Sequence, residues 1–137
     1  MEKITRVSFT IEESVLKKFD TLIQREGVPT RSEALGHLIR ESLIERQWEN
    51  GATVAGVITL VYDHHKTRLL DQIVAAQHDS GAVVICSQHA HLDHFNCMEN
   101  IIVRGKVEKI RALHQRLSAI KGIKHVVLTM TTNGQEL

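Results

Sequence analysis

The sequence predicts an α+β protein of two parts, residues 1–50 and 51–137. In the first part, a short segment of alternating apolar and polar residues precedes two segments in which apolar residues recur at helical spacing. In the second part, the periodicity gives the order strand, helix, strand, strand, helix, strand. We therefore expect a small strand and helix module followed by a larger sheet domain.

Composition limits the classes of protein to which this chain can belong. It has 137 residues, of which 42% are hydrophobic, and its net charge of +1 gives no support for nucleic-acid binding. Residues 1–48 carry eight Lys and Arg against eight Asp and Glu, so DNA binding must be inferred from residue patterns. The longest nearly uninterrupted apolar run, residues 52–62, is too short to span a membrane, and no N-terminal targeting segment is evident. We expect a cytoplasmic protein without a membrane partner, whose two cysteines are reduced.

The first part begins with a predicted strand at residues 5–11. Its apolar and polar residues alternate as two sets of three: Val7, Phe9 and Ile11 against Arg6, Ser8 and Thr10. A helix follows and ends at Gly27, and a second helix begins at Thr30 with the spacing of a capping box to Glu33. The polar stretch that ends in Asn50 and Gly51 marks the predicted domain boundary.

The second part contains six predicted elements. The strands cover residues 54–63, 82–92, 96–103 and 124–131, and the helices cover residues 67–77 and 107–120, with a turn at residues 79–81. This βαββαβ order is that of the ferredoxin-like unit.

The first part has the pattern of a DNA-binding module. A lone strand has no hydrogen-bonding partner, so we expect it to pair with the same strand of a second chain. The resulting two-stranded ribbon fits the DNA major groove, where Arg6, Ser8 and Thr10 would face base edges. The helix start at residues 30–33 would offer backbone amides to a phosphate. The alternative to a DNA-binding ribbon is an ordinary edge strand on a small helical dimer. The spacing of Thr10 and Glu13 also allows Thr10 to cap the first helix, in which case its hydroxyl would not be fully available to DNA.

The segment from His89 to Cys97, HAHLDHFNC, has the pattern of a metal site. Side chains alternate along a strand, so His89 and His91 project from the same side and can bind one ion together. Cys97 would add a thiolate, and His78 is a candidate for the remaining ligand. Imidazoles combined with a thiolate suit a transition metal.

The first part resembles the ribbon-helix-helix repressors through its alternating strand, two helices and the opening TRSEAL of the second helix. Taken together, this first part, the ferredoxin-like second part and the motif QH…HAH…C resemble the nickel-responsive repressors known as NikR. The resemblance covers almost the whole chain. That resemblance implies an ACT-type regulatory domain and a homotetramer built as a dimer of dimers. It also implies a nickel-dependent repressor, not an enzyme, that binds operator DNA and controls nickel uptake.

The resemblance further implies one Ni(II) per subunit at the tetramer interface. His89, His91 and Cys97 would bind from one subunit and His78 from a neighbour. The DNA contacts it implies outside the ribbon are Thr30, Arg31, Ser32 and Lys66. Three imidazoles and a thiolate in a plane suit a d8 ion such as Ni(II), whereas Zn(II) prefers a tetrahedron, and Cu(II) remains a competitor.

Predictions also follow for residues next to the candidate ligands and for the remaining histidines and cysteine. Gln77 and Glu99 neighbour ligands and are expected to orient an imidazole or the metal loop, with a solvated polar residue as the alternative for each. His64 and His65 are expected to form a polar turn, with a secondary metal site as the alternative, and an accessory cation site near His37 is left open. Cys86 lies among apolar residues and is expected to be small and buried.

Two other functions compete with nickel-dependent repression. Residues 89–94 match H-x-H-x-D-H, the signature of metallo-β-lactamase-like zinc hydrolases, but only 43 residues follow His94, too few for that larger domain. A ribbon-helix-helix regulator whose second domain senses an amino acid is the other alternative.

Overall fold

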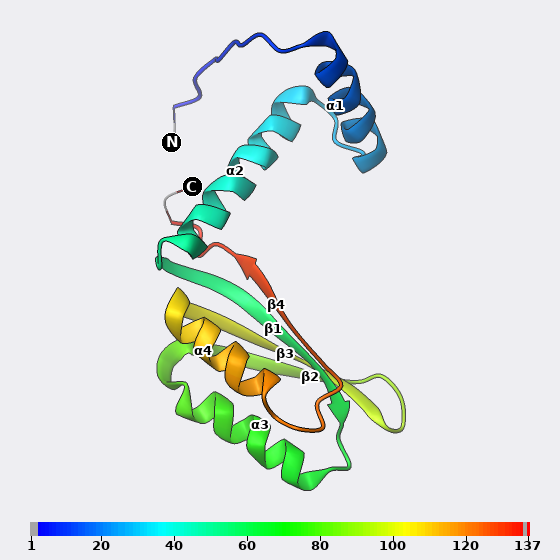
Figure 1. The fold of residues 1–137 in the computed structure, drawn as a ribbon, viewed down its shortest axis with the longest axis vertical. Helices are drawn as coiled ribbons and strands as arrows, with labels where there is room; N and C mark the ends of the chain where they lie inside the picture. Colours follow the sequence, from blue (N-terminus) through cyan, green and yellow to red (C-terminus); the bar gives the residue numbers. More distant parts are fainter. Residues whose placement is uncertain (1–2, 136) are drawn as a thin grey trace. The chain divides into compact units, whose positions relative to one another are not determined.

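The computed structural model describes residues 3–135 and 137, and the chain divides into two compact units between Glu41 and Ser42 (Figure 1). The N-terminal unit contains α1 (Glu13–Glu26) and the beginning of α2 (Arg31–Glu49). The C-terminal unit contains the end of α2 and the whole sheet domain. No helix among the described residues has the length and apolar character needed to cross a membrane.

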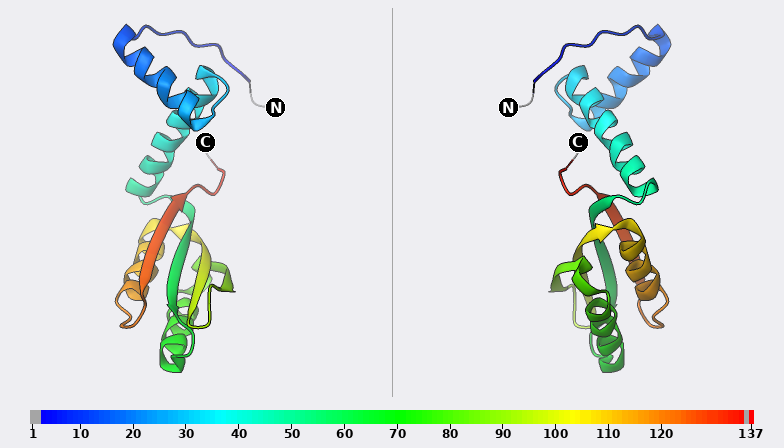
Figure 2. Two further views of the ribbon diagram at one scale, coloured as in Figure 1. Left: turned by 90° about the vertical axis from the view of Figure 1, so that its right-hand side faces the viewer. Right: turned by 90° about the vertical axis from the view of Figure 1, so that its left-hand side faces the viewer.

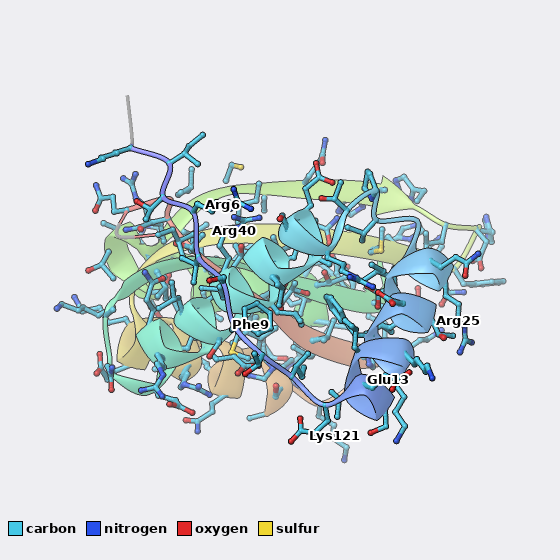
Figure 3. All side chains as sticks on the ribbon, turned by 90° about the horizontal axis from the view of Figure 1, so that it is seen from above. Arg6, Phe9, Glu13, Arg25, Arg40 and Lys121 are labelled. Atoms are coloured by element: carbon cyan, nitrogen blue, oxygen red, sulfur yellow. The ribbon has the colours of Figure 1, made fainter. Side chains whose placement is uncertain are left out.

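The segment before α1 is extended but forms no strand in the single chain. Residues 3–12 have no regular secondary structure, and the side chains of Val7 and Phe9 are exposed. Figure 3 shows Arg6 and Phe9 on this segment, ahead of Glu13 in the first turn of α1. The strand predicted at residues 5–11 is therefore absent here, because a strand needs a hydrogen-bonded neighbour that the isolated chain does not supply.

The ends of α1 and α2 follow from local sequence. Gly27 ends α1 in the left-handed region at φ 69°, a conformation that glycine adopts without steric cost. The backbone amide of Glu33 donates to the Thr30 hydroxyl oxygen at 3.1 Å, as the capping box predicts. The first residue before α1 is Glu12, so Thr10 is not the cap of this helix.

The C-terminal unit is an antiparallel sheet with two helices, and the predicted βαββαβ order is confirmed (Figures 1 and 2). Its elements are β1 (Thr53–Asp63), α3 (Thr67–Asp79), the short 3-10 helix η1 (Gly81–Val83), β2 (Val84–His91), β3 (Asn96–Lys106), α4 (Val107–Ser118) and β4 (His125–Thr131). The strand order is β2-β3-β1-β4, and every neighbouring pair is antiparallel.

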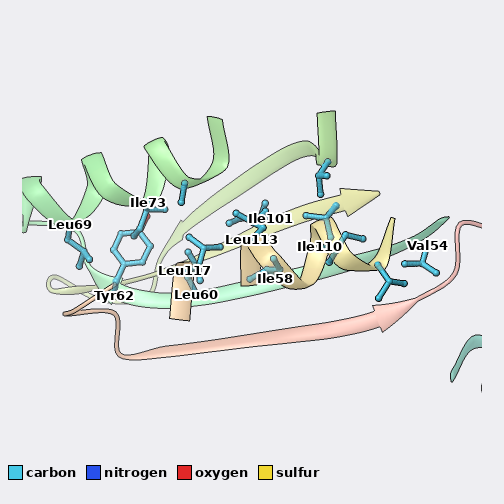
Figure 4. Close-up of a cluster of buried hydrophobic side chains, with 14 of the residues drawn as sticks. Val54, Ile58, Leu60, Tyr62, Leu69, Ile73, Ile101, Ile110, Leu113 and Leu117 are labelled. Carbon is cyan, nitrogen blue, oxygen red and sulfur yellow. The ribbon is translucent and has the colours of Figure 1, made fainter. Parts of the chain in front are cut away.

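One face of the sheet forms the core with α3 and α4 (Figure 4). Alternate residues of β1 are buried, and Ile58 is paired with the equally buried Ile101 of β3. Both helices contribute to the same cluster, so they cover the same face. The buried members are Trp48, Val54, Ile58, Leu60, Tyr62, Leu69, Ile73, Ala76, Val83, Cys97, Ile101, Val103, Val107, Ile110, Leu113 and Leu117.

An irregularity at the beginning of β2 decides which side chains of this edge strand face the helices. Val84 pairs with Val103, but Cys86 pairs with Ile102, so the register shifts by one residue at Ile85. Because side chains alternate along a strand, one extra residue exchanges the two faces. Cys86 lies opposite Ile102 on the face away from the helices and is exposed. The prediction that Cys86 is buried was therefore wrong.

We expect Ile58→Ala to lower the free energy of unfolding by about 2–5 kcal/mol, because it leaves a cavity in the fully buried core. Urea unfolding followed by circular dichroism would measure the loss. Val127→Ala is the matched control, since Val127 is 40% exposed. Equal losses in the two variants would show that the core has been wrongly located.

Candidate metal centre

The pairing of β2 with β3 places His89 and His91 beside Cys97. His91 is directly opposite Cys97, and His89 is directly opposite Glu99. These four residues point to the same side of the sheet, since Cys97 and Glu99 are two apart on β3. The imidazole centroids of His89 and His91 lie 5.1 Å apart. The strand geometry predicted for this histidine pair is thus present, with the cysteine on the neighbouring strand.

The Cys97 side chain is enclosed by the protein. Its exposed fraction is 0%, and its thiol donates to the carbonyl oxygen of Tyr62, with a distance of 3.7 Å between sulfur and oxygen. Burial raises the pKa of the Cys97 thiol, because the thiolate would lose its hydration. A thiol in such a place stays protonated until a cation compensates the charge, so metal binding there would release a proton.

A hydrogen-bonded network surrounds the buried carboxylate of Glu99, which is 7% exposed. Tyr62 Oη donates to Glu99 Oε2 at 2.7 Å, and Gln77 Nε2 donates to Glu99 Oε1 at 2.8 Å. Tyr62 Oη also lies 3.5 Å from Nδ1 of His89. Burial, reinforced by the bond to Glu99, raises the pKa of Tyr62, so this phenol remains a donor.

Sequence reasoning missed Tyr62, although the structure places it between Glu99 and His89. Tyr62 is the only tyrosine of the chain and follows a run of aliphatic residues in β1. A hydroxyl at the end of a buried strand requires a hydrogen-bonding partner, and this requirement could have identified Tyr62 from the sequence.

His78 lies apart from the other candidate ligands. It is the next residue after Gln77 in α3, and its side chain is 87% exposed. With Val74, Gln77, Val84, Ser87 and Glu99 it lines a groove of about 410 Å³ between α3 and β2. The single chain therefore does not bring His78, His89, His91 and Cys97 together around one point.

Other histidines continue the row that begins with His89 and His91. The ring of His64 is 4.6 Å from that of His91, His65 is 4.2 Å from His64, and His94 is 5.2 Å from His65. Burial and the proximity of His65 and His91 lower the pKa of His64 and favour its neutral form. Among residues 3–135 and 137, only Asp63, His64 and His65 place three possible ligand atoms within 4.8 Å of one another.

Asp93 has a structural role that disfavours the hydrolase alternative. Its Oδ1 accepts hydrogen bonds from the backbone amides of Phe95 and Asn96, both at 2.8 Å. The Asn96 side chain adds further bonds, and these donors lower the pKa of Asp93. This carboxylate stabilises the turn between β2 and β3 and is not free to activate water.

The candidate DNA-binding residues of the N-terminal segment are exposed. Arg6, Ser8 and Thr10 are all accessible to solvent. Between them in sequence, Phe9 and Ile11 line an apolar cavity of about 240 Å³ with residues of α1 and α2. Phe9 and Ile11 thus line a cavity of their own unit while remaining partly exposed, and the polar residues alternate with them.

The remaining candidates differ in their contacts. The Thr30 hydroxyl is used in the cap of α2, and the Arg31 guanidinium makes two hydrogen bonds of 2.7 Å to the carboxylate of Asp20. Arg31 is therefore held by its own chain and would have to exchange partners to contact a phosphate. Ser32 and Lys66 are exposed.

The donor set fits a thiophilic transition metal. The buried thiol of Cys97 lies opposite His91. His89 precedes His91 by two residues, and Tyr62 Oη lies near Nδ1 of His89. Hydrogen bonding to the other nitrogen commonly orients a ligating imidazole. His89, His91 and Cys97 thus present nitrogen and sulfur donors on one face of the sheet, but in the single chain they do not place three ligand atoms within 4.8 Å of one another.

Comparison with known proteins identifies the family. Residues 55–131 match the family model described as the NikR C-terminal nickel-binding domain. A protein of Desulfovibrio desulfuricans, named as a candidate nickel-responsive regulator, is 41% identical over 137 residues, covering 100% of this chain and 99% of that protein. A protein of Nitratidesulfovibrio vulgaris with the same name is 42% identical over 138 residues, with the same coverage.

A solved structure of an uncharacterized protein from Thermotoga maritima shares the fold alone, with a TM-score of 0.52 at 14% identity. That match covers 58% of this chain and 99% of the other. The family is one of regulators and not of enzymes. This chain, with its NikR-type nickel-binding domain, belongs to the family of nickel-responsive regulators.

Proposed function

We propose that this regulator is a nickel-dependent transcriptional repressor that binds operator DNA when Ni(II) is bound and controls nickel uptake. One Ni(II) per subunit would be held by His89, His91 and Cys97 of one chain and by His78 of a neighbouring chain. The observation that carries the proposal is the pairing of His91 with the buried Cys97, with His89 on the same face.

The position of His78 supports a ligand set shared between chains. Its side chain is exposed and lines the groove beside β2, so a second chain can approach it. A metal that needs ligands from two chains binds the assembled state more tightly than separate chains. By linkage, the metal then stabilises that assembly.

Binding of DNA is proposed through a ribbon formed by two copies of residues 5–11. Among the described residues of the N-terminal unit, Ala34 is the only buried hydrophobic residue. A unit that buries so little apolar surface needs a second copy to be stable. Pairing of the two segments would supply the missing strand partner and turn Arg6, Ser8 and Thr10 towards the major groove.

Contacts with the DNA backbone are assigned to Thr30, Arg31 and Ser32 at the beginning of α2 and to Lys66 before α3. The backbone amides at the beginning of a helix favour a phosphate. Lys66 is exposed in the loop that joins β1 to α3. Nickel would raise operator affinity by favouring the arrangement of chains in which all these groups reach DNA together, and it must bind that arrangement more tightly to do so.

We expect Cys97→Ala to abolish the charge-transfer absorption between thiolate and nickel, because no other described candidate ligand carries sulfur near the histidine pair. Absorption spectra recorded during titration with Ni(II) would measure this loss, with far-ultraviolet circular dichroism as the test of folding. Cys86→Ala should keep the band, since Cys86 faces the other side of the sheet. An unchanged nickel spectrum in Cys97→Ala would refute the site.

We expect Arg6→Ala to weaken specific operator binding by about 1–3 kcal/mol for each lost bidentate contact with a base. Nickel affinity should not change, because Arg6 lies in the other unit. Electrophoretic mobility shifts with operator DNA and with random DNA would distinguish recognition of bases from nonspecific electrostatic binding. Lys3→Ala removes the same charge outside the predicted strand and should affect both DNAs similarly. Normal operator binding by Arg6→Ala would exclude the ribbon.

We expect mixtures of His78→Ala and His89→Ala chains to recover part of the nickel absorption that each variant lacks alone. If the ligands come from two chains, a site with His89, His91 and Cys97 of one variant can receive His78 from the other. The two chains would be unfolded together, refolded and titrated with Ni(II), with each variant refolded alone as the control. Absence of any recovery would show that one chain supplies the whole site.

A further inference from the structure

A second cavity of the C-terminal unit lies between α3 and α4, which run side by side over the sheet (Figure 1). Its volume is about 460 Å³, and none of the candidate metal ligands lines it. Ala76 and Asp79 of α3 form one wall with Ser80 and Gly81, which follow that helix. The other wall belongs to α4. The cavity is therefore built by one chain and lies outside the candidate metal centre.

The α4 wall is a single face of that helix. Lys109, Ala112, Leu113 and Arg116 follow one another at the spacing i, i+3, i+4 and i+7, which places them in one row. Leu113 is buried in the core, whereas Ala112 is exposed and carries only a methyl group. On α3, Ala76 is equally small. Small side chains on both helices thus leave an open space with an apolar floor.

Two cationic side chains border this space. Lys109 and Arg116 are seven residues apart on α4, so their Cα atoms are separated by about 10 Å along the helix. No carboxylate of the described residues forms an ion pair with Lys109. Arg116 Nη2 donates to Asp79 Oδ2 at 2.8 Å, a bond that uses one of the five N–H donors of the guanidinium. Both cations therefore have donors available to a ligand.

The surroundings of the cavity are also strongly basic. Residues 104–124, which include α4, carry seven Lys and Arg against the single acidic residue Glu108. The whole chain carries 17 Lys and Arg against 16 Asp and Glu, so the rest of the sequence is acidic. Basic charge is thus concentrated around α4, and the resulting potential attracts anions to this part of the domain.

We propose that the cavity between α3 and α4 binds a small aliphatic dicarboxylate. One carboxylate is bound by Arg116, whose planar guanidinium matches the geometry of a carboxylate. The other carboxylate is bound by Lys109, and the hydrocarbon chain between them lies over Ala112 and Leu113. A volume of about 460 Å³ is within the range of small-molecule sites, about 300–1,000 Å³.

Two other ligands fit the same cavity less well. Inorganic phosphate is compact and cannot reach both Lys109 and Arg116 while covering the apolar floor between them. An amino acid would require Asp79 for its ammonium group, but that carboxylate is already paired with Arg116. Two cations on either side of an apolar surface therefore favour a ligand with a carboxylate at each end.

Isothermal titration calorimetry of the full chain without nickel tests the binding, at neutral pH and constant ionic strength. The probes are glutarate and adipate, with butyrate as the matched monocarboxylate and inorganic phosphate as the compact anion. We expect the better dicarboxylate to bind about fivefold more tightly than butyrate, because it makes a second ion pair. Absence of binding by both dicarboxylates, or phosphate that binds as tightly as they do, would overturn the proposal.

Variants of the cations test the location of the ligand. We expect Lys109→Ala and Arg116→Ala each to weaken dicarboxylate binding about fivefold. Arg116→Lys should give a smaller loss, since it keeps the charge without the planar group. Lys121→Ala removes an exposed cation that does not line the cavity and should leave the affinity unchanged. Equal losses in Lys121→Ala and Lys109→Ala would show general attraction of anions instead of a site.

Asp79→Asn distinguishes a dicarboxylate from an amino acid by the sign of the effect. It removes a negative charge beside the ligand, so we expect the dicarboxylate to bind about threefold more tightly. A ligand whose ammonium group pairs with Asp79 would instead bind more weakly to this variant. Glutamate that binds the unmodified protein more tightly than glutarate, and loses affinity in Asp79→Asn, would replace the dicarboxylate with an amino acid.

Ala112→Leu fills the cavity without changing its charge. Because Ala112 is exposed, we expect the variant to fold and to lose dicarboxylate binding. Gln115→Leu adds the same side chain to α4 outside the cavity and should keep the affinity. Circular dichroism would verify folding, and Ala112→Gln serves as the second variant if Ala112→Leu does not fold. Unchanged dicarboxylate binding in the folded variant at position 112 would refute the site.

Discussion

The candidate site depends above all on the register between β2 and β3. The shift at Ile85 brings His89 and His91 to the face that carries Cys97 and Glu99. Without the extra residue, the same two histidines would point to the open face, and Cys86 would turn towards the helices. The irregularity in this edge strand therefore decides whether the two histidines lie on the same face of the sheet as Cys97.

The same face of the sheet also carries Glu99, a buried carboxylate that connects β3 with β1 and α3. A carboxylate buried beside apolar residues is costly unless its oxygens are hydrogen-bonded. Here one oxygen is bonded by Tyr62 of β1 and the other by Gln77 of α3. Tyr62 in turn approaches His89, and Gln77 precedes His78 in sequence. In the proposed assembly, Glu99 would thus connect, through Tyr62 and Gln77, the regions of two ligands: His89, used by its own chain, and His78, used by a neighbouring chain.

Much of the fold follows from periodicity, and much of the site does not. Alternation of apolar residues located all four strands of the sheet domain, and the capping box located the beginning of α2 at Thr30. The bulge at Ile85 leaves no mark in the alternation, so the exposure of Cys86 was not predicted. The pair formed by Arg31 and Asp20, and the position of Tyr62, depend on contacts between residues distant in sequence, which periodicity does not describe.

The predicted strand at residues 5–11 fails to form for a different reason. Its apolar and polar residues alternate as in a strand, but the single chain supplies no hydrogen-bonded neighbour, and our proposal assigns that neighbour to a second chain. In the same single chain, α1 has no buried residue, whereas the sheet domain has a full core. If two copies pair as proposed, the stability of this module depends on assembly. A metal that links chains through His78 would then act on the folding of the DNA-binding surface as well as on its position.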